Sequence, residues 1–147
     1  MSILRHAFGE NAIAVQASVA DRTEAIFLTG DLLVQSGRVA RPYVASMIEA
    51  VETFGPYIVI APGIALAHGK PSEEVFENGL SLLVLREAVR FQHEAHDPVS
   101  LVFGLAARDH LSHIDLMAEL SEKLSDSKWV NSLLTCFDIR TIRQLLG

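Results

Sequence analysis

The sequence predicts a single α/β domain whose mixed, mostly parallel sheet has helices on both faces. Segments with helical periodicity alternate along the chain with short apolar runs that read as strands. Several of these runs are apolar at successive positions, which is typical of strands that are buried on both faces. The chain has 147 residues, of which 50% are hydrophobic, so one domain with a sizeable core is expected.

The first half of the chain predicts one strand and two helices. Residues 13–19 alternate partly and indicate an early strand. Asp21 suits the N-cap of a helix that runs to residue 35 and ends near Gly37. Arg41–Pro42 opens a second helix, which ends near Phe54. The expected buried stripes are Ala25, Ile26, Leu28, Leu32 and Leu33 in the first helix, and Val44, Met47, Ile48 and Val51 in the second.

The second half predicts further buried strands followed by three helices. Residues 57–60 are apolar on both faces and indicate an interior strand, which Pro62–Gly63 interrupts. Other strands are expected at 79–85, 89–91 and 99–106, and helices at 110–124, 128–136 and 139–146.

Composition excludes several classes of protein. The net charge is −6 and the twelve lysines and arginines are scattered, which disfavours a nucleic-acid binder. A single cysteine rules out a disulfide framework and a four-thiolate zinc site. The first residues lack a signal-peptide pattern, and the apolar runs are too short to insert into a membrane. A cytoplasmic protein is therefore expected.

His68 is the histidine best placed for chemistry. It follows apolar runs that must be buried, and Gly69 and Pro71 then force the chain to turn. An imidazole at such a strand end is held by a rigid scaffold and opened to solvent. Lys70 adds positive charge nearby. The alternative interpretation is an ordinary loop histidine.

The remaining histidines leave alternatives open. If a helix begins near Asp109, the Asp109 carboxylate and the His113 ring share one face, so the carboxylate can orient the ring. Alternatively, Asp109 is simply the N-cap. His93 and His96 resemble a metal pair, but they lie in a polar loop before Pro98, which favours a solvated turn over a metal site. Cys136 is expected to pack as a small hydrophobic residue.

Residues 55–71, GPYIVIAPGIALAHGKP, resemble the active-site segment of EIIA components of the bacterial sugar phosphotransferase system. The mannitol/fructose-type superfamily has a motif of the form G-I-A-[LVM]-P-H-[AG]-[RK]-P. The longer form, which begins G-P-Y-I-V-I-A-P-G, is similar to the ascorbate-type subgroup. The resemblance continues through Asp97–Val99 and through Asp109 with His113. It covers nearly the whole chain, so residues 1–147 are expected to form one EIIA type-2 domain.

The resemblance implies that His68 accepts a phosphoryl group from phospho-HPr. His68 would then pass the group to a cysteine of an EIIB component, for uptake of an ascorbate-like carbohydrate. His113 would face His68 and help to hold the phosphoryl group, and Asp109 takes the family's acidic position. Backbone N–H groups near Gly69, and the charge of Lys70, would support the phosphoryl oxygens.

The same resemblance implies no metal or nucleotide cofactor and leaves room for a homo-oligomer. Two departures stand out: Ala67 replaces the usual proline, and Lys70 replaces a common arginine. Two other hypotheses remain. One is a regulatory EIIA-like protein that signals by its phosphorylation state. The other is a metal-dependent hydrolase that uses His93, His96, His110 and His113.

Overall fold

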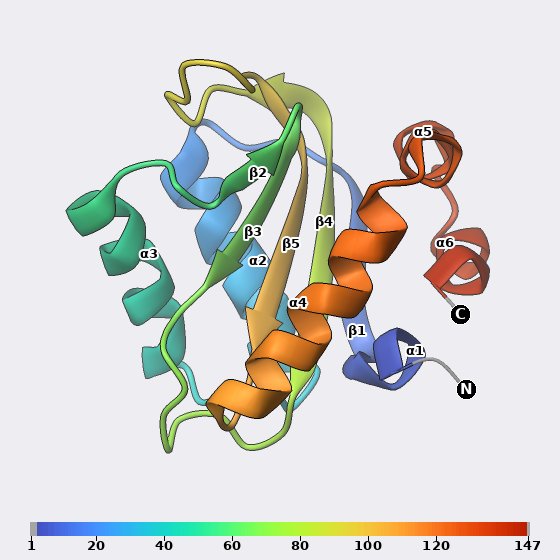
Figure 1. The fold of residues 1–147 in the computed structure, drawn as a ribbon. Helices are drawn as coiled ribbons and strands as arrows, with labels where there is room; N and C mark the ends of the chain where they lie inside the picture. The colour runs from blue at the N-terminus through green and yellow to red at the C-terminus, as the bar shows by residue number, and fades with distance from the viewer. Residues whose placement is uncertain (1–2, 147) are drawn as a thin grey trace.

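The computed structural model describes residues 3–146 and contains one five-stranded sheet (Figure 1). The strands are β1 (Phe8–Ala17), β2 (Val59–Ala61), β3 (Ile64–His68), β4 (Gly79–Val89) and β5 (Val99–Ala106), in the order β1-β4-β5-β3-β2. Pairs β1–β4 and β3–β5 are parallel, whereas β4–β5 and β2–β3 are antiparallel. The predicted mixed α/β sheet is therefore confirmed, with the two kinds of pairing in equal number.

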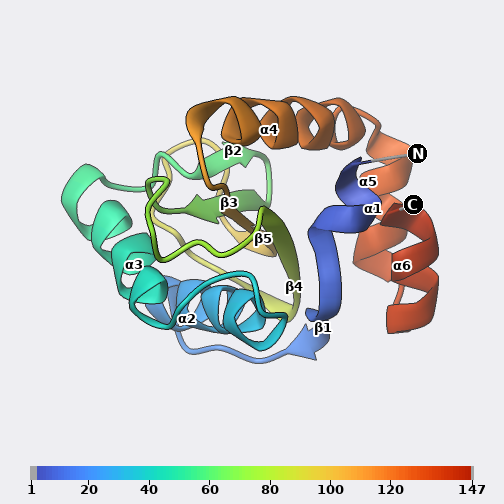
Figure 2. The ribbon, with the colours of Figure 1, turned by 90° about the horizontal axis from the view of Figure 1, so that it is seen from below.

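Helices cover both faces of this sheet (Figure 2). They are α1 (Ile3–Ala7), α2 (Arg22–Gln35), α3 (Pro42–Phe54), α4 (His110–Leu124), α5 (Ser127–Thr135) and α6 (Ile139–Leu146). Helices α2 and α3 pack on one face, and the other helices pack on the opposite face. Along β3, Ile64 and Leu66 enter one core while Ala65 and Ala67 enter the other. The strand is buried on both sides, as its apolar sequence predicts.

The helix predictions are confirmed, with differences in which residues are buried. The Asp21 side chain caps α2 by accepting from the Glu24 N–H at 2.9 Å. Gly30, which the apolar pattern omits, faces α3: a Cβ there would lie 2.8 Å from a Val44 methyl carbon. This glycine lets the two helices approach closely. Three residues outside the predicted apolar stripes are buried in the structure: Thr29, Gly30 and Tyr43. Three residues of the predicted stripes are only half-buried: Leu28, Leu32 and Ile48.

The strand predictions need three corrections. The run at 57–60 was expected to be an interior strand, but β2 is an edge strand in which Ile60 is 39% exposed. The reason is that Gly63, at φ +76°, turns the chain back into β3. The run at 89–91 is not a separate strand, because β4 continues to Val89. Strand β1 begins at Phe8, and its alternation is broken where Asn11 and Gln16 adopt positive φ.

The sheet brings distant segments to one end of the molecule. Strands β3 and β5 are parallel, and His68 pairs with Leu105 near their carboxyl ends. Helix α4 follows β5 directly, so its first turn begins beside the end of β3 (Figure 1). Functional groups in α/β folds gather at such strand ends. Within residues 3–146, no helix has the length and apolar character needed to cross a bilayer.

Candidate active site

His68 is the last residue of β3 and is half-buried. Its Nδ1 lies 3.0 Å from the carbonyl oxygen of Leu66. A carbonyl oxygen only accepts hydrogen bonds, so in the neutral ring the proton is on Nδ1 and Nε2 keeps its lone pair. The backbone of β3 therefore fixes both the tautomer and the orientation of this imidazole.

Two rings flank His68 from different parts of the fold. The ring of His113, on the first turn of α4, has its centroid 5.3 Å away at an interplanar angle of 60°. The ring of Tyr57, ahead of β2, lies at 5.8 Å and 84°, and Phe54 packs edge-on to Tyr57 at 6.3 Å. The structure thus places the two histidines of the sequence analysis together.

His113 is in an environment that disfavours its charged form. Its pKa lies below the ordinary value, first because the ring is partly desolvated and then because His68 and His110 are close. Its Nδ1 is buried and has no hydrogen-bond partner among the described residues. A neutral ring near pH 7 is expected. An anion brought between the two histidines would favour the protonated ring again.

Tyr43, on α3, holds the backbone next to His68. Its hydroxyl donates to the Leu105 carbonyl at 3.1 Å and accepts from the Gly69 N–H at 3.0 Å. Burial is the main cause that raises the pKa of Tyr43 to about 12, so the hydroxyl keeps its proton. The local spacing of residues gave no signal for this contact, because 26 positions separate Tyr43 from Gly69.

This contact changes the expected role of Gly69. Its N–H was expected to face phosphoryl oxygens, but in the structure it donates to Tyr43. The glycine is needed for space instead: a Cβ would lie 2.6 Å from Ser46 Oγ and 3.2 Å from the Tyr43 ring. Gly69 therefore lets the chain pass closely against α3.

The hydroxyl of Tyr43 gives a direct test of this anchor. Tyr43→Phe leaves the buried Gly69 N–H and Leu105 carbonyl without this partner, so we expect the free energy of unfolding to fall by roughly 1–3 kcal/mol. Urea denaturation measures it. Tyr57→Phe, whose parent side chain is 47% exposed, is the matched control and should change stability by less than about 0.5 kcal/mol. A Tyr43→Phe variant as stable as this control would contradict the anchoring role.

Asp109 is the N-cap of α4. Its carboxylate is exposed and accepts from the Ser112 N–H at 2.8 Å, and this hydrogen bond is the largest of the causes that lower its pKa. Of the two interpretations of this residue, the geometry matches the cap. Lys70 is exposed and lines a cavity of about 430 Å³ with Tyr57 and His68, beside α3.

The other histidines do not converge on one site. His93 and His96 stack at 4.7 Å in the loop before β5, whereas His110 and His113 follow the other end of that strand. His93 Nδ1 accepts from the backbone N–H of His96 at 3.1 Å, which makes it part of the turn. Within residues 3–146, no three potential metal ligands form a cluster. The four-histidine metal site is therefore not assembled.

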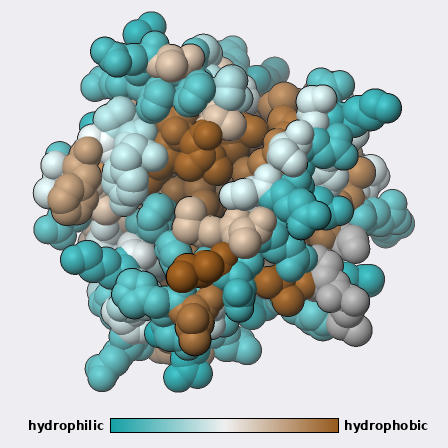
Figure 3. Space-filling view, in the orientation of Figure 1, coloured by the Kyte–Doolittle hydropathy of each residue, from teal (hydrophilic) through white to brown (hydrophobic). Residues whose placement is uncertain are grey.

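Apolar side chains are exposed around the two facing histidines. Figure 3 shows hydrophobic surface over β2 and over the first turns of α4. On α4, Leu111 is 77% and Ile114 is 60% exposed, and Phe54 at the end of α3 is 69% exposed. Such a concentration of exposed apolar side chains is typical of a surface that contacts other proteins.

Known proteins share this chain's sequence and fold. Residues 6–147 match the family described as "Phosphoenolpyruvate-dependent sugar phosphotransferase system, EIIA 2". The chain is 36% identical to the ascorbate-specific PTS system EIIA component of Salmonella choleraesuis, over 97% of this chain and 92% of that protein. It is 35% identical to the Escherichia coli protein of the same name, with the same coverage.

Solved structures agree with this relationship. The crystal structure of IIA mannitol from Escherichia coli superposes with a TM-score of 0.84 at 29% identity, covering 95% of this chain and 99% of that one. These matches extend over the sheet, the helices and the segment around His68. The chain therefore belongs to the EIIA 2 family, whose members are phosphotransferase components of the phosphoenolpyruvate-dependent sugar phosphotransferase system.

Proposed function

We propose that this protein is a phosphoryl carrier that takes a phosphoryl group from phospho-HPr on His68. It then passes the group to a cysteine of an EIIB component during uptake of an ascorbate-like carbohydrate. The observation that carries the proposal is the His68 ring itself. Its Nδ1 is held by the Leu66 carbonyl at 3.0 Å, which leaves Nε2 as a nucleophile at an accessible strand end.

The relatives support the same proposal. The chain resembles ascorbate-specific EIIA components over nearly its full length. It also superposes on the mannitol IIA of Escherichia coli in a complex with phosphorylated IIB, at a TM-score of 0.84 and 28% identity over 95% of this chain and 96% of that one. We include in the proposal that residues 1–147 form one EIIA type-2 domain and that it works in the cytoplasm.

The geometry of His68 supports a direct, in-line transfer. The Nε2 lone pair forms the new N–P bond while the bond from phosphorus to the donor breaks, so the charge stays on the phosphoryl oxygens. The ring becomes cationic as it is phosphorylated, and its Nδ1–H points at the negative end of the Leu66 carbonyl dipole. Little else is required, because phosphoryl transfer depends mainly on positioning and on charge stabilisation.

His113 supplies that charge stabilisation in our proposal. The phosphoryl dianion on His68 favours protonation of His113, which raises its depressed pKa, and the ring then donates a hydrogen bond to a phosphoryl oxygen. Lys70 and the exposed N-terminal turn of α4, capped by Asp109, lie at the same end of the molecule. They add positive potential there.

The exposed apolar side chains around His68 fit the partners that the proposal requires. HPr and EIIB must each dock and leave, and transient complexes of this kind generally have small interfaces. Cys136 is half-buried and packs against the core formed with α4 and α6. This placement supports our proposal that the thiol that receives the phosphoryl group lies on another protein.

The nitrogen that carries the phosphoryl group is the sharpest test. After incubation with phosphoenolpyruvate, enzyme I and HPr, we expect intact-mass measurement to show one acid-labile phosphoryl group, and nitrogen and phosphorus NMR to assign it to Nε2 of His68. Phosphorylation at Nδ1, or none at all, would overturn the proposal. Transfer to EIIB separates the carrier from the regulatory alternative, which predicts phosphorylation without onward transfer.

A further inference from the structure

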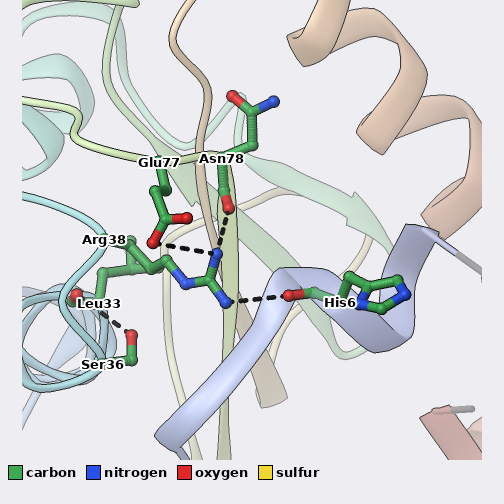
Figure 4. A network of polar contacts seen from close by, with 6 residues as sticks. All are labelled: His6, Leu33, Ser36, Arg38, Glu77 and Asn78. Atoms are coloured by element: carbon green, nitrogen blue, oxygen red, sulfur yellow. Dashed lines mark hydrogen bonds and ion pairs between the residues drawn. The ribbon is translucent and has the colours of Figure 1, made fainter.

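Arg38 lies just after α2 and binds the backbone of two other segments (Figure 4). Its Nη1 donates to the Asn78 carbonyl at 2.9 Å and its Nη2 to the His6 carbonyl at 2.9 Å. Its side chain is 15% exposed, whereas that of Glu77, 3.9 Å away, is 69% exposed. An exposed and distant ion pair contributes little, so the main contacts of Arg38 are with the backbone.

The chain is shaped to accept this arginine. The Arg38 carbonyl accepts from the Phe76 N–H at 2.8 Å and from the Glu77 N–H at 3.3 Å. A Cβ on Gly79 would lie 2.5 Å from Arg38 Cγ, so the glycine makes room for the side chain. Arg38 thus fixes the segment that leads into β4 in three ways: it accepts from two backbone N–H groups, it donates to the Asn78 carbonyl, and it packs closely against Gly79.

Asn78 extends this hold to the start of α4. Its Oδ1 accepts from the Arg108 N–H at 2.8 Å, and Arg108 directly precedes Asp109, the N-cap of α4. The ladder between β4 and β5 reaches the Gly79–Ala106 pair at this end. The Asn78 side chain therefore fixes the backbone beyond the sheet, where the chain passes from β5 into the helix.

The first turn of α4 links the position of the Arg108 backbone to that of His113. The Asp109 carbonyl accepts from the His113 N–H at 3.1 Å, and the Asp109 carboxylate accepts from the Ser112 N–H. These hydrogen bonds tie His113 to Asp109 and so to Arg108. A shift of Arg108 relative to the sheet therefore moves the His113 ring relative to His68, which is fixed separately on β3.

We propose that Asn78, held by Arg38, is a positioning residue that sets His113 against His68 for phosphoryl transfer. This inference rests on the proposed function, in which His113 holds the phosphoryl group. Asn78 acts through the backbone of Arg108 rather than on the reacting atoms. Its main contribution is to the rate of transfer within a docked complex, because a reaction between positioned atoms is more sensitive to a small shift of α4 than the apolar contacts of Leu111 and Ile114 are.

Two substitutions at Asn78 separate positioning from general stability. Asn78→Ala removes the acceptor, whereas Asn78→Asp keeps an acceptor oxygen for the Arg108 N–H. We expect Asn78→Ala to lower kcat for transfer from phospho-His68 to EIIB roughly tenfold, to change KM for EIIB by a clearly smaller factor, and to shift the imidazole NMR signals of His113. Asn78→Asp should recover most of the rate. Asn131→Ala, at an exposed position on α5, is the matched control and should resemble the wild type.

The outcomes are distinct from those that test the proposed function. Asn78→Ala at the control rate, or with unchanged His113 signals, would overturn the positioning role, as would an Asn78→Asp variant as slow as Asn78→Ala. If Asn78→Ala fails to fold, Arg38→Lys, which loses the guanidinium fork, provides the same readouts with a smaller expected change; wild-type values there would equally overturn it. If the wild type accepts no phosphoryl group, the proposed function fails, and the His113 signals alone still decide whether Asn78 positions the ring.

Discussion

The His68→Ala variant is expected to gain no phosphoryl group when it is incubated with phosphoenolpyruvate, enzyme I and HPr. The reason is that His68 supplies the nucleophilic Nε2, with its tautomer set by the Leu66 carbonyl. We do not expect the facing ring of His113 to replace it, because that ring lies on a different element and its Nδ1 is buried. Intact-mass measurement under non-acidic conditions detects the difference as an all-or-none change.

His96→Gln is the matched histidine control for this experiment. His96 lies in the loop before β5, at the opposite end of that strand from the Leu105 position that pairs with His68. We expect it to be phosphorylated like the wild type. If His68→Ala still gains one phosphoryl group, or if His96→Gln gains none, the assignment of the nucleophile is wrong.

The His113→Ala variant is expected to accept a phosphoryl group on His68 and to transfer it to EIIB about 10²-fold more slowly than the wild type. Removing the imidazole removes a donor for the phosphoryl oxygens at the point where charge must be stabilised. The fold should tolerate the change, because His113 Nδ1 has no hydrogen-bond partner to lose among the described residues. Rapid-quench measurement of phosphoryl transfer to EIIB gives the rate.

His110→Ala tests whether this loss is specific. His110 lies on the same first turn of α4 and is exposed, so its removal changes the polar surface near the site but not the ring that faces His68. We expect a rate within a few-fold of the wild type. Wild-type transfer by His113→Ala would remove His113 from the mechanism, and an equal loss in both variants would indicate a general effect of the helix terminus.

Local sequence patterns predicted most of the secondary structure. Helix α4 and strand β5 have the predicted bounds, since their apolar spacing and the Asp109 cap act over a few residues. The patterns failed where pairing partners matter: Val59–Ala61 is as apolar as an interior strand, but the turn at Gly63 leaves it at the edge. Apolar composition reports burial and does not report how many neighbours a strand has.

For the candidate site, the motif around His68 was enough to identify this histidine as the main candidate and to indicate a relationship with EIIA components. The groups that surround His68 follow from the three-dimensional packing alone. Parallel pairing of β3 with β5 brings the ring centroid of His113 to 5.3 Å from that of His68. Packing of α3 brings the Tyr43 hydroxyl into hydrogen-bond contact with the Gly69 N–H. These contacts join residues far apart in the chain, and local spacing carries no information about the register and packing that create them.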